Sequence, residues 1–298
     1  MTFRPSGIFV PLITPFTDNG ALGVGDLERL ARTVIEEGAA GIVALGTTAE
    51  AATLSTQERG EVVEICSRVC REHKVPLLVG AGSNDTAGTV RALDELHSEA
   101  DVAGALVVVP YYTRPSEAGV VAHFEYVAER SPLPLILYNV PYRTGQYLGF
   151  ESLVRLSAHP QIVGIKQAVG AVDTDTARLL AEPSDAFSVL AGEDALVSPL
   201  LAMGAEGAIL ATANVCAREF VDLFQLWRSG DTPQARDLGN QLVGPACALM
   251  ADPNPTVIKA VLHAQGRIST PTVRLPLLPA RSSAIREALQ HIPLRPRR

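Results

Sequence analysis

The sequence predicts a (β/α)8 barrel with a C-terminal helical region, because short apolar runs and amphipathic segments alternate eight times along the chain. The apolar runs are nearly continuous, as in Ala105-Leu106-Val107-Val108-Val109, which suits parallel strands that are buried on both faces. Eight such units within residues 1–215 fit a closed barrel better than an open sheet. After Ala211 the strand pattern fades, and residues 216–298 are expected to form a helical region.

The predicted strands are short runs rich in β-branched and other apolar residues. In chain order they are Gly7–Ile13, Gly41–Leu45, Val75–Val79, Gly104–Val109, Leu133–Tyr138, Ile162–Ile165, Phe187–Leu190 and Gly207–Leu210. The segments between them have helical periodicity, and Ser55-Thr56-Gln57-Glu58 resembles a capping box. The predicted barrel helices are Val24–Glu37, Ser55–Glu72, Thr86–Glu99, Glu117–Glu129, Phe150–Ser157, Thr174–Leu180 and Asp194–Met203. The C-terminal helices are expected at Glu219–Arg228, Pro233–Ala251, Thr256–Gln265 and Ser282–His291.

Composition excludes several classes of function. The chain has 298 residues, a net charge of −7 and 47% hydrophobic residues, so a folded domain is expected. The acidic balance argues against nucleic acid as a partner, because phosphate-backbone binding needs a concentrated basic face. The first apolar stretch, Gly7–Phe16, contains two prolines and lacks a cleavage site, so we expect neither a signal peptide nor a membrane segment.

The cysteines indicate neither a disulfide framework nor a metal site. Four cysteines are too few to staple a chain of this length, so a reducing cytoplasm is the expected location. Cys66 and Cys70 are four residues apart, but no second ligand pair stands at zinc spacing. We therefore expect both to be buried as small apolar residues.

A nucleotide-binding fold is the competing prediction. Gly80-Ala81-Gly82 lies between a predicted strand and a predicted helix, as a dinucleotide fingerprint would. The third glycine position is Asp85, however, and no Gly-Lys-Ser/Thr phosphate motif occurs. A nicotinamide oxidoreductase is thus disfavoured, and no cofactor is expected.

The chemistry is expected where the strands end, because the carboxyl ends of barrel strands converge on one face. Only three residues are lysines, and one of them, Lys166, ends an apolar strand. Burial there would lower its pKa and make the neutral amine a nucleophile. The alternative is a structural pair with Glu193 or Asp194. Lys74 and Lys259 are expected to be solvated charges.

Several other polar residues follow predicted strands. Tyr112 and Tyr138 are candidates for proton transfer, or else half-buried packing residues. Thr47 and Thr48 have the hydroxyl and backbone donors for a carboxylate, or they cap the next helix. Arg143 suits bidentate carboxylate recognition, or it is an ordinary surface arginine.

Taken together, four motifs identify a family. The sequence resembles the dihydrodipicolinate synthase/N-acetylneuraminate lyase family of pyruvate-dependent class I aldolases over almost its whole length. The resemblance implies that Lys166 forms an imine with pyruvate and that no metal is needed. The motifs are Gly46-Thr47-Thr48-Ala49-Glu50, Tyr138-Asn139-Val140-Pro141, Gly164-Ile165-Lys166 and Gly192-Glu193-Asp194.

The resemblance also implies roles for the surrounding residues. Thr47, Tyr112 and Tyr138 would form the proton relay, with Tyr112 reaching in from a neighbouring subunit. Thr48 would bind the carboxylate of pyruvate, and Arg143 the carboxylate of aspartate semialdehyde. The Ile209 carbonyl and Gly192 would lie at the substrate. A homo-oligomer follows from sharing Tyr112, and family members are usually tetrameric.

The arginine two positions after Pro141 favours the branch of the family that condenses pyruvate with L-aspartate 4-semialdehyde in lysine biosynthesis. Ala49 replaces the usual glycine, which leaves open a sibling aldolase or dehydratase acting on a sugar acid or another aldehyde. A binder without catalysis is disfavoured, because a binder has no use for a proton relay.

Feedback inhibition by lysine is expected to be weak or absent. Thr56, Arg59 and Gly88 stand where feedback-inhibited relatives often carry histidines and a glutamate. Inhibition at physiological lysine concentrations in a dose–response assay would contradict this expectation.

Overall fold

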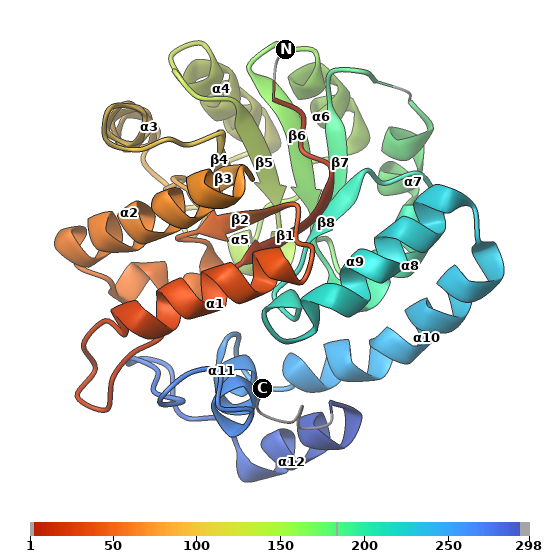
Figure 1. Ribbon diagram of the computed structural model, residues 1–298. Helices are drawn as coiled ribbons and strands as arrows, with labels where there is room; N and C mark the ends of the chain where they lie inside the picture. The colour runs from red at the N-terminus through yellow and green to blue at the C-terminus, as the bar shows by residue number, and fades with distance from the viewer. Residues whose placement is uncertain (1–2, 183, 293–298) are drawn as a thin grey trace.

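The predicted barrel is confirmed by a computed structural model, which describes residues 3–182 and 184–292. Eight parallel strands pair in sequence order, and β1 pairs with β8 to close the barrel (Figure 1). The strands are β1 (Gly7–Pro11), β2 (Gly41–Ala44), β3 (Leu77–Gly80), β4 (Gly104–Val108), β5 (Leu135–Asn139), β6 (Ile162–Gln167), β7 (Ser188–Ala191) and β8 (Gly207–Ile209).

Helices surround the strands and bury their apolar faces. In α2, Ser55 and Glu58 form the predicted capping box, in which each side chain accepts from the other residue's backbone N–H. The barrel helices are α1 (Val24–Glu36), α2 (Thr56–His73), α3 (Thr86–Glu99), α4 (Glu117–Ala128), α6 (Phe150–Ser157), α7 (Thr174–Ala181), α8 (Val197–Ala202) and α9 (Ala213–Ser229). Short helices follow three strands: η1 (Thr47–Ala49) and η2 (Ala51–Thr53) after β2, α5 (Pro141–Thr144) after β5 and η3 (Asp194–Leu196) after β7.

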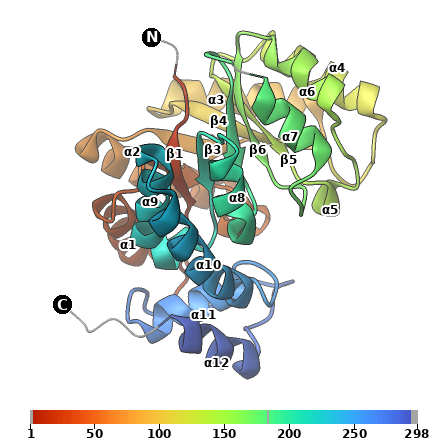
Figure 2. The ribbon, with the colours of Figure 1, turned by 90° about the vertical axis from the view of Figure 1, so that its right-hand side faces the viewer.

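The C-terminal helices lie at the end of the barrel where the strands terminate. They are α10 (Thr232–Leu249), α11 (Thr256–Ala264) and α12 (Ser282–His291), and Figure 2 shows α11 and α12 below the barrel. Helix α9 runs through position 215 and packs against β1. We propose that the chain divides into a catalytic barrel at 1–215 and a C-terminal helical region at 216–298, although α9 extends across this boundary.

Some predicted strands were too long at their ends. The first strand stops at Pro11 rather than Ile13, because the Ile13 N–H donates to the Asn214 side chain, 3.1 Å away, instead of to a neighbouring strand. The prediction for the first two cysteines is correct, since Cys66 and Cys70 are both buried. Over residues 3–182 and 184–292, no helix is long and apolar enough to cross a membrane.

The structure explains the glycines that resembled a nucleotide fingerprint. A Cβ at Gly80 would overlap the Leu45 carbonyl oxygen, and a Cβ at Gly82 would lie 2.6 Å from the Val108 backbone nitrogen. Both glycines therefore allow the end of β3 to approach β2 and β4 closely. Their role in packing the barrel is sufficient reason for the Gly80-Ala81-Gly82 sequence.

This close approach predicts opposite effects for two Gly→Ala substitutions. Gly82→Ala should lower the free energy of unfolding by about 1 to 3 kcal/mol, because backbone atoms of β4 must move to admit the methyl group. Gly60→Ala is the control, because Gly60 lies in α2 with nothing within 4 Å of the added Cβ. It should raise stability by up to about 1 kcal/mol in the same urea titration. Equal effects at the two sites would contradict this account.

Candidate active site

A cavity of about 650 Å³ opens at the carboxyl ends of the strands. Its wall combines apolar strand residues with polar side chains from the loops after β2, β4 and β5. Four of the predicted site residues line it: Thr47, Tyr112, Tyr138 and Arg143. The cavity therefore brings together residues that are almost 100 positions apart in the sequence.

Lys166 does not line this cavity itself but lies next to Tyr138, which does. It is on β6 in register with Tyr138 on β5, and its Nζ is 4.4 Å from the centre of the Tyr138 ring. The residue is only 7% exposed. Within residues 3–182 and 184–292, no hydrogen-bond acceptor is found for Nζ, and the amine lies over the Tyr138 ring.

Burial controls the charge of this lysine. It lowers the pKa of Lys166 to about 8, because an ammonium ion is poorly solvated inside the barrel. The negative field of Asp194 opposes this change, and the guanidinium of Arg143 adds to it. A substantial fraction of Lys166 is therefore neutral near pH 8.

Neither neighbouring carboxylate forms an ion pair with Lys166 in the described part of the chain. Asp194 Oδ1 instead accepts from the backbone N–H of Thr212, at 2.7 Å, and from its hydroxyl group. Burial raises the pKa of Glu193 and that of Asp194. The geometry therefore does not favour the alternative in which Lys166 forms a structural ion pair with Glu193 or Asp194. Both carboxylates still interact electrostatically with Lys166.

Gly192 packs against the lysine, and Ile209 lies inside the barrel. A Cβ at Gly192 would lie 2.9 Å from Lys166 Cγ and 2.7 Å from Ala168 Cβ, so only glycine leaves room for the extended lysine. Ile209 ends β8 and belongs to the same buried cluster as Tyr138 inside the barrel. The contact of Gly192 and of the Ile209 carbonyl with a substrate stays a prediction.

Arg143 is exposed on the short helix α5 at the rim of the cavity. Its Nε donates to the Tyr142 hydroxyl, 2.9 Å away, and its guanidinium carbon lies 4.9 Å from the centre of the Tyr142 ring. Tyr142 therefore restrains the arginine while the outer N–H groups stay available to a ligand. Tyr142 was not identified from the sequence.

Tyr112 also lines the cavity and is 89% exposed. Its backbone has φ 71°, and Arg114, two residues further, also has a positive φ. Such angles are unfavourable for tyrosine and arginine. A side chain with this exposure is poorly shielded from water for proton transfer within its own subunit.

Thr48 is placed differently from Thr47. It is 3% exposed and is not among the residues that line the cavity. Its Oγ1 accepts a hydrogen bond of 3.0 Å from Asn254 Nδ2, which comes from the C-terminal region. Asn254 was not identified from the sequence.

The prediction for Lys259 was wrong. Lys259 is completely buried, not solvated, and its Nζ forms an ion pair with Glu50 and donates to the Thr272 carbonyl oxygen at 2.9 Å. Its neighbours on α11 are the buried apolar residues Val257, Ile258, Ala260, Val261 and Leu262. A lysine within such an apolar run was the available signal of burial. Lys74, in contrast, is exposed as predicted.

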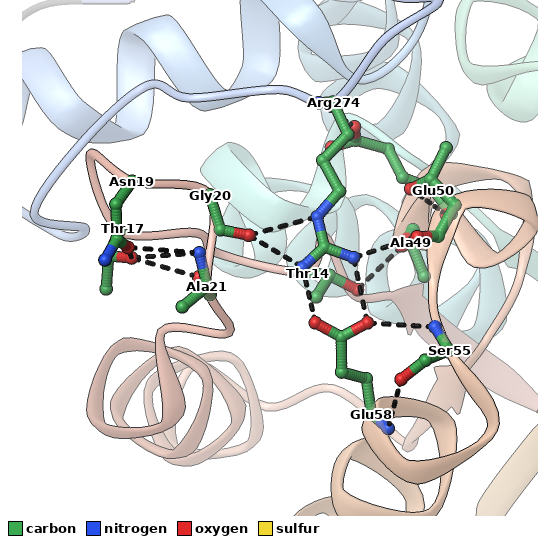
Figure 3. A network of polar contacts seen from close by, with 11 residues as sticks. Thr14, Thr17, Asn19, Gly20, Ala21, Ala49, Glu50, Ser55, Glu58 and Arg274 are labelled. Atoms are coloured by element: carbon green, nitrogen blue, oxygen red, sulfur yellow. Dashed lines mark hydrogen bonds and ion pairs between the residues drawn. The ribbon is translucent and has the colours of Figure 1, made fainter.

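A network of polar contacts joins the C-terminal region to the turn after β2 (Figure 3). The Arg274 backbone N–H donates to Glu50 Oε2 at 3.0 Å, and its guanidinium donates to Thr53 O at 2.8 Å and to the carboxylate of Glu58. Glu58, at the start of α2, also accepts from the Ser55 backbone. On the other side of the turn, Thr14 Oγ1 donates to Ala49 O at 2.7 Å. The turn that carries Thr47 and Thr48 is therefore fixed at several points.

The three residues of the predicted effector region lie on two neighbouring barrel helices, α2 and α3. Thr56 is exposed at the first turn of α2, Arg59 lines the cavity and donates to Ala51 O, and Gly88 lies in α3. The expectation of weak inhibition by lysine stays a prediction.

Comparison with known proteins identifies the family. The sequence model of the Dihydrodipicolinate synthetase family matches residues 4–292. The 4-hydroxy-tetrahydrodipicolinate synthase of Methanopyrus kandleri is 40% identical, and the alignment covers 99% of each chain. The chain belongs to the dihydrodipicolinate synthetase family and, like its relatives, is a lyase.

Solved structures of relatives have the same fold. The dihydrodipicolinate synthase of Acinetobacter baumannii, solved in complex with pyruvate, is 35% identical with a TM-score of 0.91, covering 96% of this chain and 98% of that one. A monomeric dihydrodipicolinate synthase variant is 32% identical with a TM-score of 0.92, covering 97% of each chain. Members of this fold therefore include a protein that is not an oligomer.

The buried ion pair predicts a large difference between single and double substitutions. Lys259→Met should lower the free energy of unfolding by about 3 to 5 kcal/mol, because Glu50 is left buried without its partner. The double variant Glu50→Gln/Lys259→Met should recover most of this loss, because neither buried charge remains. Urea unfolding of both variants measures the difference. A double variant no more stable than Lys259→Met would contradict this interpretation of the pair.

Proposed function

We propose that this lyase condenses pyruvate with L-aspartate 4-semialdehyde through an imine on Lys166, and so forms 4-hydroxy-tetrahydrodipicolinate in lysine biosynthesis. The observation that carries the proposal is the buried amine of Lys166, 4.4 Å from the Tyr138 ring and in register with it. Its lowered pKa makes the neutral, nucleophilic form accessible near pH 8.

The first half of the reaction uses Lys166 and Tyr138. The neutral amine adds to C2 of pyruvate, and the resulting carbinolamine loses water to give an iminium ion. Loss of a proton from C3 then gives an enamine, with the iminium nitrogen as the electron sink. Tyr138 would move these protons together with Thr47, and burial keeps the Tyr138 phenol protonated by raising its pKa. Thr48 would bind the pyruvate carboxylate.

The second half joins the two substrates and releases the enzyme. The enamine carbon attacks the aldehyde carbon of the semialdehyde, whose oxygen takes up a proton to become a hydroxyl group. The amino group of the semialdehyde portion then attacks C2 of the iminium and displaces the Lys166 amine, which closes the ring. Arg143 would hold the carboxylate of the second substrate at the rim of the cavity.

A subunit-sharing arrangement belongs to the same proposal. Tyr112 is almost fully exposed on a loop with positive φ, so a second copy of the chain would receive it as part of its proton relay. A homodimer or homotetramer is therefore expected, as is a cytoplasmic location. A sibling aldolase or dehydratase remains the alternative function, since the rim would also accept other carboxylates.

Trapping of the imine tests the role of Lys166. Incubation with pyruvate and cyanoborohydride should attach one pyruvate-derived group, which peptide mapping should locate on Lys166. Because the neutral amine reacts, the initial rate of labelling should rise with pH and level off above about pH 8. Lys166→Ala should abolish labelling, whereas the exposed Lys74→Ala is the control and should retain it. Label on Lys74 or Lys259, or its absence, would exclude this mechanism.

Substitution of Arg143 tests the second substrate. Arg143→Ala should raise the KM for aspartate semialdehyde roughly 10- to 100-fold, because a charge-assisted hydrogen bond contributes about 1.5 to 3 kcal/mol. Trapping of pyruvate on Lys166 should be unchanged well above pH 8, where the amine is neutral whether or not the Arg143 guanidinium lowers its pKa. Arg143→Lys keeps the charge but loses the two-pronged geometry, so it should recover activity only in part. Higher activity of the parent protein on a panel of sugar acids would favour the sibling function.

A further inference from the structure

The hydroxyl group of Thr48 has an unusual hydrogen-bonding state. A hydroxyl group has one donor hydrogen and two acceptor lone pairs. Asn254 Nδ2 donates to Thr48 Oγ1 at 3.0 Å, so one lone pair is already used. Within residues 3–182 and 184–292, no acceptor is found for the Thr48 hydroxyl proton. The side chain is therefore a buried donor without an acceptor, and it lies beside Thr47, which lines the cavity.

Asn254 donates this hydrogen bond from outside the barrel. It lies in the loop between α10 and α11 and is half-buried. Its own Oδ1 is buried and has no hydrogen-bond partner in the described part of the chain. The amide nitrogen therefore contributes a hydrogen bond to the folded state, whereas the amide oxygen contributes none within the described residues.

The position of Asn254 relative to Thr48 is fixed by the contacts on both sides. Lys259, on the helix that follows Asn254, forms the ion pair with Glu50, two residues after Thr48. Arg274 also binds Glu50 (Figure 3), and its guanidinium donates to the Thr53 carbonyl oxygen. These contacts prevent the amide and the hydroxyl group from shifting relative to each other.

We infer that Asn254 is a positioning residue for substrate binding: by donating to Thr48 Oγ1, it directs the Thr48 hydroxyl proton toward the carboxylate of pyruvate. The inference rests on the proposed function, in which Thr48 binds that carboxylate. Without the amide, the hydroxyl group is free to rotate and to donate elsewhere. Asn254 itself does not touch the substrate.

Two substitutions at position 254 separate this role from simple packing. Asn254→Ala removes the donor and should raise the KM for pyruvate about 3- to 10-fold, as expected for one hydrogen bond. Its kcat should change less than twofold. Asn254→Asp keeps the shape but presents an oxygen that accepts the Thr48 proton, so its KM should rise further than that of Asn254→Ala. The pyruvate concentration for half-maximal labelling of Lys166 should follow the same order.

A double-mutant cycle tests whether the effect passes through Thr48. In the background of Thr48→Val, which lacks the hydroxyl group, Asn254→Ala should cause no further change in KM. Gln265→Ala is the matched control, because Gln265 also has a buried side-chain oxygen without a partner in the described chain, but it does not bind the turn. It should leave the KM unchanged.

The outcomes distinguish this inference from the proposed function. If the parent protein is not labelled on Lys166, the proposed function fails. If it is labelled but the Asn254 variants keep the parent KM, or if their effects add to that of Thr48→Val, only the positioning role is overturned. Should Asn254→Ala fail to fold, the near-isosteric Asn254→Asp still decides the matter, because a KM equal to that of the parent contradicts the inference.

Discussion

The ion pair between Glu50 and Lys259 joins the two parts of the chain at the turn that follows β2. Two opposite charges without access to water hold each other in place, because either one alone would be strongly disfavoured in the interior. Arg274 extends this restraint to the start of α2 through Glu58 (Figure 3). The geometry of Thr47 and Thr48, and with it one wall of the cavity, depends on these contacts.

Burial lowers the pKa of two lysines, with different consequences for their chemistry. It lowers the pKa of Lys166 and that of Lys259, each to about 8. The Lys259 amine is nevertheless not available as a nucleophile, because it donates hydrogen bonds to Glu50 and to the Thr272 carbonyl oxygen. Lys166 faces an aromatic ring at the edge of a cavity. A lowered pKa therefore does not identify a nucleophile by itself, and the surrounding hydrogen bonds separate the two cases.

The barrel and most of the candidate site follow from local patterns, which is why both were predictable. Strand periodicity located Lys166 and Tyr138, and barrel closure brings the ends of neighbouring strands together whatever the loops contain. Asn254, Lys259 and Arg274 were not identified, because their partners lie more than 200 residues earlier in the sequence. Lys259 was misplaced since charge was given more weight than the apolar run around it, and Tyr142 because an exposed tyrosine has no periodic signal.

The order of synthesis gives the C-terminal contacts a consequence for folding in the cell. A ribosome completes β8 at Ile209 well before it adds Asn254, Lys259 and Arg274. A nascent barrel would thus have all its strands before Lys259 is available to pair with Glu50. Until then the Glu50 carboxylate must remain hydrated, and the turn after β2 is not held in its final conformation. The emerging polypeptide would acquire an ordered pocket only when the segment that carries Asn254, Lys259 and Arg274 docks, which delays ligand capture until after that segment has been synthesised.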